Sequence, residues 1–156
     1  MKISDFLCRD AVSNDLKGST KPEIIAEMVN LLVDASILEK KHKGKVVEVL
    51  MAREALGSTA IGQGIAIPHG KSEATTKLIS ALAVSKKGIH FDSLDGEPSY
   101  IFFLLVAPID SAGPHLKVLA KISRLLKDKF FRDSLRNAKS TKDILELISQ
   151  EDSRIG

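Results

Sequence analysis

The chain has no tryptophan and one tyrosine among its 156 residues, so few aromatic rings are present on which nucleic-acid bases could stack. Its single cysteine, Cys8, cannot form a disulfide within the chain, which is typical of a reducing compartment. No apolar run approaches the roughly 20 residues that a membrane-spanning helix needs. The N-terminal residues are charged where a signal peptide needs an apolar stretch. We therefore expect a cytoplasmic protein without membrane insertion.

Two common kinds of ligand site are also missing from the sequence. The four histidines at positions 42, 69, 90 and 115 lack the short spacing of metal ligands, and no second cysteine supports a zinc site. The glycines of Gly62–Gly64 are not followed by the Lys-Ser/Thr pair with which a P-loop binds nucleotide phosphates. We expect neither a metal nor a nucleotide cofactor.

The composition is that of an ordinary globular domain, with 44% hydrophobic and 28% charged residues. The net charge is +3, but the lysines are interleaved with acidic residues along most of the chain. The densest basic cluster, Lys40–Lys45, has no aromatic partner, which favours a solvated turn and argues against nucleic-acid binding. The length fits one domain covering residues 1–156.

Helical periodicity occupies both ends of the chain. Thr20 and Glu23 have the spacing of a capping box before the first helical pattern, and Thr141 is the expected N-cap of the last one. The first expected helix ends near residue 36. The others cover about 43–55, 115–126, 130–138 and 141–150.

Strand-like runs occupy the middle of the chain, at residues 65–67, 79–84 and 100–106, with another short candidate at 89–91. The run at 100–106 is almost wholly apolar, which predicts a central strand buried on both faces. Helices before and after a cluster of strands indicate an α/β fold in which helices cover both faces of one sheet. The pattern leaves the strand order open.

His69 is the most informative single residue. It follows the apolar run at 65–67 and lies between Pro68, which restricts the backbone, and Gly70, which leaves room beside the ring. An imidazole on a stiff loop at a strand end is well placed for direct chemistry. The alternative is a turn histidine that bonds only to water or to a neighbouring carbonyl.

The residues around His69 form a longer pattern, which contains Glu54, Ile61, Gly62 and the run Ile65–Gly70. This pattern resembles the phosphohistidine signature of EIIA domains of the fructose/mannitol type. Such domains belong to the bacterial phosphoenolpyruvate-dependent sugar phosphotransferase system, and the type includes stand-alone nitrogen-regulatory members. The resemblance extends from the first helix to residue 148 and includes Asp95–Pro98, Leu105–Pro108 and the His115-Leu116 pair.

The resemblance implies a mixed sheet of about five strands between helix layers, with phosphorylation of His69 on Nε2. It also implies that a second histidine, His115, lies beside His69 and orients or stabilises the phosphoryl group. From the residues alone, His115 is expected near a helix N-terminus, where backbone donors favour an anion and disfavour the imidazolium form. A solvent-facing His115 is the alternative.

Three further residues are candidates for binding phosphoryl oxygens. Arg53 ends the preceding helical pattern, and its planar guanidinium matches a phosphoryl group, although a surface arginine paired with an acid is the alternative. Family members carry an arginine at this spacing, which favours the functional interpretation. Ser58 and Thr59 can supply hydroxyls, or can instead cap backbone groups in the turn.

These observations lead to one main hypothesis and two alternatives. As a phosphocarrier, the chain would accept a phosphoryl group on His69 from the carrier protein HPr, or from its nitrogen-branch homologue, and pass it to an EIIB domain for sugar uptake. As a nitrogen-branch regulator, its phosphorylation state would control protein partners. A third possibility is an anion-binding module that is never phosphorylated.

Overall fold

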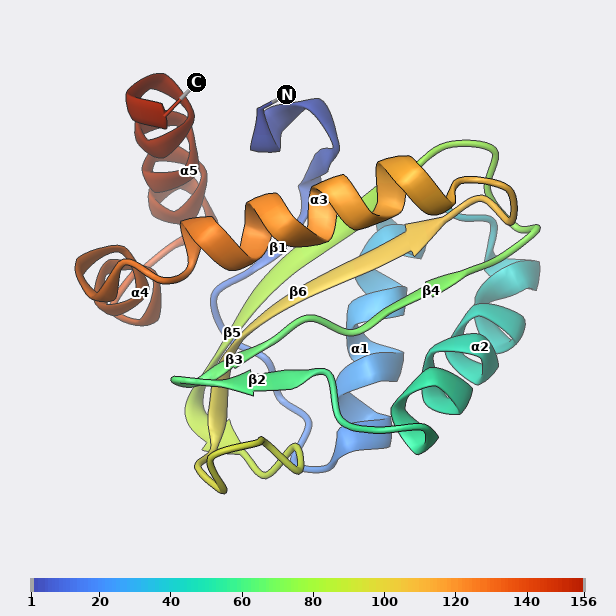
Figure 1. Ribbon diagram of the computed structural model, residues 1–156, viewed down its shortest axis with the longest axis horizontal. Helices are drawn as coiled ribbons and strands as arrows, with labels where there is room; N and C mark the ends of the chain where they lie inside the picture. The colour runs from blue at the N-terminus through green and yellow to red at the C-terminus, as the bar shows by residue number, and fades with distance from the viewer. Residues whose placement is uncertain (1, 156) are drawn as a thin grey trace.

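The computed structural model describes residues 2–155 and is built around a six-stranded mixed sheet with helices on both faces (Figure 1). The strands are β1 (Leu7–Ser13), β2 (Ala60–Gly62), β3 (Ile65–Ala66), β4 (His69–Lys71), β5 (Ile79–Ile89) and β6 (Ser99–Ala107). The α-helices are α1 (Lys21–Asp34), α2 (Lys43–Ala55), α3 (Ala112–Leu125), α4 (Lys129–Arg136) and α5 (Thr141–Ile155). Two short 3-10 helices are η1 (Ile3–Asp5) and η2 (Lys40–His42). No helix of the described chain is long and apolar enough to span a membrane.

The strands follow the order β1-β5-β6-β3-β2, and β4 also pairs with β6. The long strands β5 and β6 are antiparallel, whereas β1 is parallel to β5, and both β3 and β4 are parallel to β6. The segment from Ile65 to Lys71 therefore runs along one edge of β6 as two short strands. Pro68 interrupts the ladder, because it has no N–H to donate, but its carbonyl accepts a hydrogen bond from Leu105 (2.9 Å).

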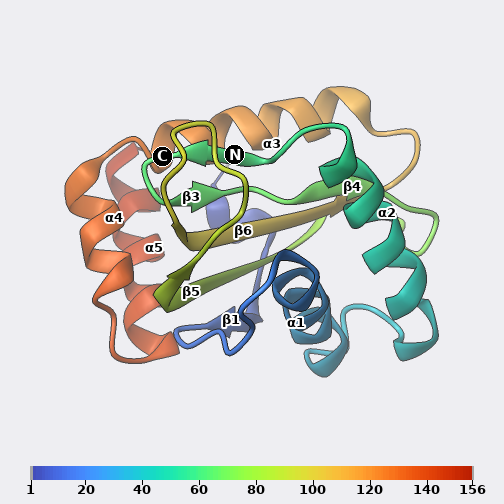
Figure 2. The ribbon, with the colours of Figure 1, turned by 90° about the horizontal axis from the view of Figure 1, so that it is seen from below.

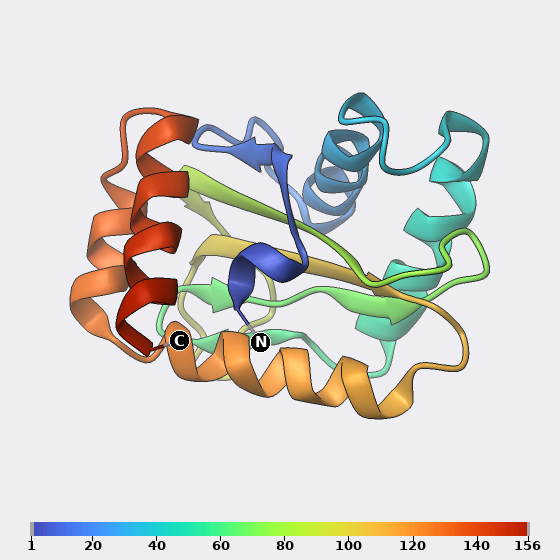
Figure 3. The same cartoon turned by 90° about the horizontal axis from the view of Figure 1, so that it is seen from above.

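The sheet lies between two helix layers (Figures 2 and 3), and alternate residues of the central strands contribute to two different cores. Ile101, Phe103 and Leu105 of β6 contribute to a core beneath α3, α4 and α5. Phe102 and Leu104 contribute to a second core beneath α1 and α2. All five side chains are fully buried, so the period of two along an apolar strand supplies both cores at once.

The expected α/β architecture is confirmed, with one strand more than the five implied by the resemblance. The central strand expected at 100–106 is β6, and the helix expected at 43–55 is α2. The capping box of α1 is present: the Thr20 hydroxyl accepts from the Glu23 N–H (3.3 Å), and the Glu23 carboxylate accepts from the Thr20 N–H (3.1 Å). These elements follow from strong periodicity or a complete capping motif.

Other expectations were wrong. No separate strand covers 89–91, because β5 continues through an irregularity after Val84 and ends at Ile89. The last helix runs on to Ile155, and its cap is Ser140 and not Thr141, since the Ser140 hydroxyl accepts from the Asp143 N–H (3.1 Å). The third helix begins before His115, at Ala112. The strand β1 and the short strands β2 and β4 were not expected.

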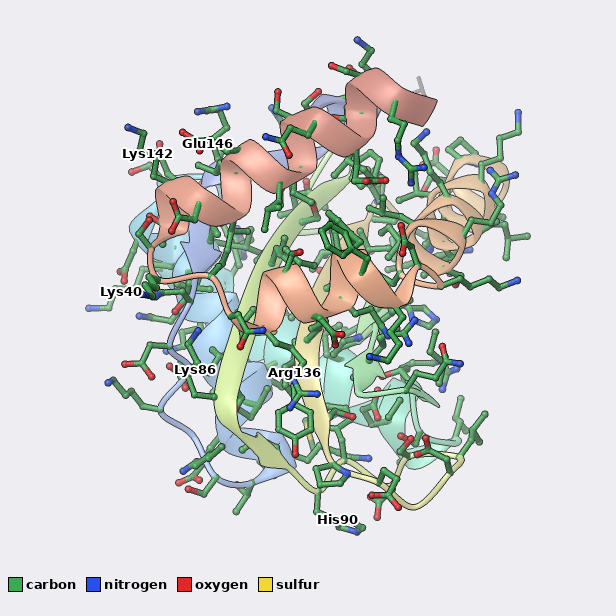
Figure 4. All side chains as sticks on the ribbon, turned by 90° about the vertical axis from the view of Figure 1, so that its left-hand side faces the viewer. Lys40, Lys86, His90, Arg136, Lys142 and Glu146 are labelled. Atoms are coloured by element: carbon green, nitrogen blue, oxygen red, sulfur yellow. The ribbon has the colours of Figure 1, made fainter. Side chains whose placement is uncertain are left out.

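Long side chains join α4 to the β5–β6 hairpin (Figure 4). The Lys86 ammonium donates to the carbonyls of Arg136 (2.9 Å) and Ala138 (2.7 Å), which lie at the C-terminal end of α4. The Arg136 guanidinium stacks over the Tyr100 ring, with 3.6 Å between Cζ and the ring centroid. A cation at a helix C-terminus and a cation–π contact thus stabilise the docking of α4 on the sheet.

A buried carboxylate ties the two ends of the chain together. Asp152 of α5 accepts hydrogen bonds from the backbone N–H groups of Ile3 (2.7 Å) and Ser4 (3.0 Å) in η1. The Asp152 side chain is buried, as is that of Ile3. The N-terminal segment is therefore held against α5 by polar as well as apolar contacts.

We expect Asp152→Ala to lower the free energy of unfolding by about 1–3 kcal/mol, because it leaves backbone donors without acceptors in a buried place. Urea denaturation monitored by circular dichroism measures this change. Glu146→Ala, on the exposed side of the same helix, is the matched control and should change stability by less than about 0.5 kcal/mol. Equal effects of the two substitutions would show that the Asp152 hydrogen bonds add nothing.

Candidate active site

His69 is the first residue of β4, where it is paired with Leu105 of β6. The sequence predicted a loop at a strand end, but β6 extends far enough to bind a second parallel segment after the break at Pro68. The half-buried His69 ring has its Nδ1 2.7 Å from the carbonyl oxygen of Ile67. A carbonyl can only accept, so Nδ1 carries the proton and Nε2 keeps its lone pair. The local backbone thus selects one tautomer.

The surroundings of His69 also favour the neutral ring. Burial lowers the pKa of His69 below its ordinary value of 6.5, the Ile67 carbonyl raises it, and the positive charge of Arg53 lowers it further. A neutral imidazole with an unprotonated Nε2 is the nucleophilic form of histidine. An imidazole in this state can attack an electrophile without a separate base to remove a proton.

Gly70 brings helix α2 close to His69. A Cβ at Gly70 would lie 2.9 Å from Cγ1 of Val49, so only glycine lets β4 and α2 approach this closely. Arg53 lies one helical turn beyond Val49 and therefore on the same face of α2. Its Nη1 donates to the carbonyl of Gly57 (2.8 Å), which holds the guanidinium at the C-terminal end of the helix.

His115 approaches His69 from the other side, since β4 lies between α2 and the first turns of α3 (Figures 1 and 2). The two rings are 5.4 Å apart between centroids and nearly perpendicular, at 86°. His115 is only 6% exposed, which excludes the solvent-facing alternative. Its Nε2 is buried and has no hydrogen-bond partner among the described residues. Burial lowers the pKa of His115, and the charges of His69 and Lys71 lower it further.

The hydroxyls of Ser58 and Thr59 are used within the protein. Ser58 donates to the carbonyl of Phe91 (2.6 Å) and accepts from the N–H of Ala60 (3.0 Å). Thr59 is buried, and both its hydroxyl and its N–H (3.2 Å) donate to the carboxylate of Glu54. These contacts match the alternative in which the two hydroxyls stabilise the turn, and a role in binding phosphoryl oxygens stays a prediction.

Glu54 and Lys21 form a buried ion pair beneath this turn that sequence reasoning did not identify. The Lys21 ammonium lies 3.2 Å from the Glu54 carboxylate and 3.0 Å from that of the exposed Asp92. Glu54 was visible in the sequence only as the first residue of the signature, without a role. Lys21 carries no sequence signal, because it lies 33 positions before Glu54 and meets it only after folding.

The arrangement can stabilise an anion bound to His69. It contains an unprotonated ring nitrogen, a second ring nitrogen without a partner, a guanidinium and the N-terminal end of the 14-residue helix α3. Within residues 2–155, no group of three His, Cys, Asp or Glu side chains is close enough to hold a metal ion. The chemistry that these groups support is attack by nitrogen on an electrophile that carries negative charge.

Comparison with known proteins agrees with this geometry. Residues 5–151 match the family described as phosphoenolpyruvate-dependent sugar phosphotransferase system, EIIA 2. The chain belongs to this family. The resemblance around His69 is thereby confirmed for nearly the whole chain, and members of the family carry phosphoryl groups in phosphotransfer.

Individual relatives come from both functional branches of the EIIA family. The chain is 37% identical over 149 residues to a nitrogen regulatory protein of Bradyrhizobium diazoefficiens, covering 96% of this chain and 95% of that protein. It is 34% identical over 152 residues to the fructose-specific EIIABC component of Bacillus subtilis, covering 97% of this chain but 24% of that longer protein. The crystal structure of nitrogen regulatory protein IIA-Ntr from Neisseria meningitidis superimposes with a TM-score of 0.83 at 31% identity, covering 94% of this chain and 98% of that one.

We expect His69 and His115 to titrate below pH 6.5 in the folded protein, because burial disfavours both charged rings. Proton NMR of the ring Cε1–H signals, assigned by substitution, gives the midpoints, and a histidine in an unfolded peptide is the reference. Since the unfolded chain then binds more protons, stability is complete above pH 6.5 and decreases as the pH falls towards the folded-state values. Midpoints at or above 6.5 would contradict the burial argument.

Proposed function

We propose that this chain is a phosphocarrier in which His69 accepts a phosphoryl group from the phosphohistidine of HPr, or of its nitrogen-branch homologue, and passes it to an EIIB domain for sugar uptake. The observation that carries the proposal is the hydrogen bond between Nδ1 of His69 and the Ile67 carbonyl, which leaves Nε2 unprotonated. Membership of the EIIA family supports the same reaction. No metal or nucleotide is required for this step.

The transfer step balances with these groups alone. The lone pair of His69 Nε2 attacks phosphorus, the P–N bond to the donor ring breaks, and the donor nitrogen keeps the electron pair. A PO3⁻ unit is thereby transferred, and His69 gains positive charge at its Nδ1–H group. The Ile67 carbonyl accepts from that group and so stabilises the charge as it develops. The reverse sequence at the same nitrogen passes the phosphoryl group onward.

The neighbouring groups would stabilise the phosphoryl oxygens by position and charge, as phosphoryl transfer requires. An Nε2–H tautomer of His115 would donate to an oxygen and would give this buried nitrogen the partner that it lacks. Arg53 would supply positive charge from the other side of β4. Ser58 and Thr59 could contribute only if the turn released their present acceptors, so we assign them a secondary role.

Exposed apolar side chains on the segments around the site suit a transient protein partner. Leu56 follows α2, Leu116 follows His115 in α3, and both are exposed. Large apolar side chains that face solvent beside a reactive group are typical of a surface covered during function. A contact of this kind is small and short-lived, as a carrier needs in order to release its partner.

A nitrogen-branch regulatory role is the second candidate. It is favoured by the identity of 37% to the nitrogen regulatory protein of Bradyrhizobium diazoefficiens, against 34% and 30% to fructose-specific components of Bacillus subtilis and Haloferax volcanii. The TM-score of 0.83 to IIA-Ntr from Neisseria meningitidis supports the same role. In that role the charge of the phosphorylated state would itself be recognised by protein partners. Transfer from the phosphorylated protein to purified EIIB domains distinguishes the roles, because only a transport component needs an EIIB acceptor.

We expect His69→Ala to abolish phosphorylation, because it removes the nitrogen whose lone pair the Ile67 carbonyl keeps free. Intact mass after incubation with phosphoenolpyruvate, the first kinase of the system and HPr measures the added phosphoryl group. His90→Ala, which changes an exposed histidine bound only to Asp92, is the matched control and should leave phosphorylation complete. If the wild-type protein gains no mass, the phosphocarrier proposal is wrong, and an anion-binding module that is never phosphorylated is favoured.

His115→Ala should still accept a phosphoryl group but should pass it on about 10-fold or more slowly, because a donor to the oxygens is lost while the nucleophile remains. Rapid-quench measurement of transfer in both directions tests this. His115→Gln, which keeps a donor of similar reach, should recover part of the rate. Unchanged transfer in His115→Ala would reduce His115 to a packing residue.

A further inference from the structure

We propose that Glu54, held by Lys21 and Thr59, is a positioning residue for phosphoryl transfer: it holds the turn whose Gly57 carbonyl binds the guanidinium of Arg53. The proposal rests on the proposed function of His69 and adds a residue that would not touch the phosphoryl group. The buried Glu54 carboxylate would affect the reaction rate only indirectly, by fixing the position of the Arg53 guanidinium.

The Glu54 carboxylate is fully enclosed and fully bonded. Its side chain is 2% exposed, and it accepts hydrogen bonds from the Lys21 ammonium (3.2 Å), the Thr59 N–H (3.2 Å) and the Thr59 hydroxyl. The Lys21 side chain is 14% exposed, so water screens the pair weakly. A buried carboxylate is tolerated only when it is paired in this way, which makes each partner necessary to the others.

The same contacts close the turn between α2 and β2. Thr59 bonds back to the Glu54 carboxylate, and the Gly57 N–H donates to the Glu54 carbonyl (3.1 Å). Gly57 has a φ of 152°, a conformation in which glycine is favoured. Its carbonyl is the acceptor for Arg53, so the place of the guanidinium depends on the shape of the turn.

The segment after β5 supports the turn from outside. The Ser58 hydroxyl donates to the Phe91 carbonyl, and the Lys21 ammonium lies 4.8 Å from the centroid of the Phe91 ring. Lys21 also pairs with Asp92. Lys21 therefore connects the N-terminal end of α1, the end of α2 and this segment. Its positive charge also offsets the negative charge of the Glu54 carboxylate, which would otherwise repel a phosphoryl dianion on His69.

A purely structural ion pair would behave differently. Its loss would lower stability without changing the place of Arg53 or the reactivity of His69. An amide at position 54 has one acceptor oxygen in place of two, so Glu54→Gln removes part of the hydrogen bonding and leaves the Lys21 charge without its buried partner. Thr59→Val removes only the hydroxyl at nearly constant volume, and Thr59→Ser keeps it.

The experiment compares these variants with Asp152→Ala, which removes the hydrogen bonds between α5 and η1 and so destabilises the protein without touching the turn or its partners. Phosphoramidate serves as the chemical phosphodonor, so that protein docking does not enter the rate. We expect the initial rate of His69 phosphorylation to fall at least about 10-fold in Glu54→Gln and Thr59→Val, the effect of one hydrogen bond to a charged group. Thr59→Ser and Asp152→Ala should stay within about twofold of wild type on the same scale.

A second measurement reads the place of Arg53 directly. In protein labelled with ¹⁵N-arginine, the Arg53 Nε–H signal should be sharp in wild type and broadened or shifted in Glu54→Gln and Thr59→Val, but not in Asp152→Ala. Rates that fall only in line with the melting temperature, or an unmoved Arg53 signal, would overturn the positioning role. If Glu54→Gln does not fold, the two Thr59 variants decide the question. If wild-type His69 takes up no phosphoryl group, the proposed function fails, while the Arg53 signal still tests the positioning claim.

Discussion

The hydrogen bond from His69 Nδ1–H to the carbonyl of Ile67 is the interaction on which the chemistry of this protein depends. It joins residues two apart on the extended segment that pairs with β6 on both sides of Pro68. Proline restricts the backbone there, and the Leu105 N–H holds the Pro68 carbonyl to β6. The Ile67 carbonyl thus selects the tautomer, which leaves on Nε2 the lone pair that the proposed phosphoryl transfer needs. A histidine on a freely moving loop would not have this preference built into its surroundings.

The sheet gives this histidine its two companions. Because β4 is parallel to β6 and has helices on either side, α2 brings Arg53 from one layer and α3 brings His115 from the other. The absence of a side chain at Gly70 lets α2 pack closely against β4. On the other side, His115 is buried and its position is therefore fixed. Both helix layers are anchored by alternate residues of β6. The same apolar strand therefore supports the core and positions the site.

The parts of this fold that periodicity determines could be predicted from the sequence, as α1, α2 and β6 show. The strands β1, β2 and β4 could not, because they are short or carry charged residues and exist only through pairing with longer neighbours. For the site, the Pro-His-Gly context made His69 a candidate, whereas the family resemblance implied both its phosphorylation and its pairing with His115. The two rings do lie side by side. The sequence did not show that the Ser58 hydroxyl donates to the Phe91 carbonyl and the Thr59 hydroxyl to the Glu54 carboxylate. It also gave no local signal for the contact between Lys21 and Glu54, which forms only in the folded chain.

The central claim is that the backbone chooses Nε2 of His69 as the atom that is phosphorylated. Long-range ¹H–¹⁵N correlation spectra of the ¹⁵N-labelled protein, recorded before and after phosphorylation, identify the protonated and the phosphorylated ring nitrogen. The account predicts a proton on Nδ1 in the unphosphorylated protein, and afterwards phosphorus coupling to Nε2 with Nδ1 still protonated. Phosphorylation on Nδ1, or an Nε2–H tautomer in the resting protein, would contradict it.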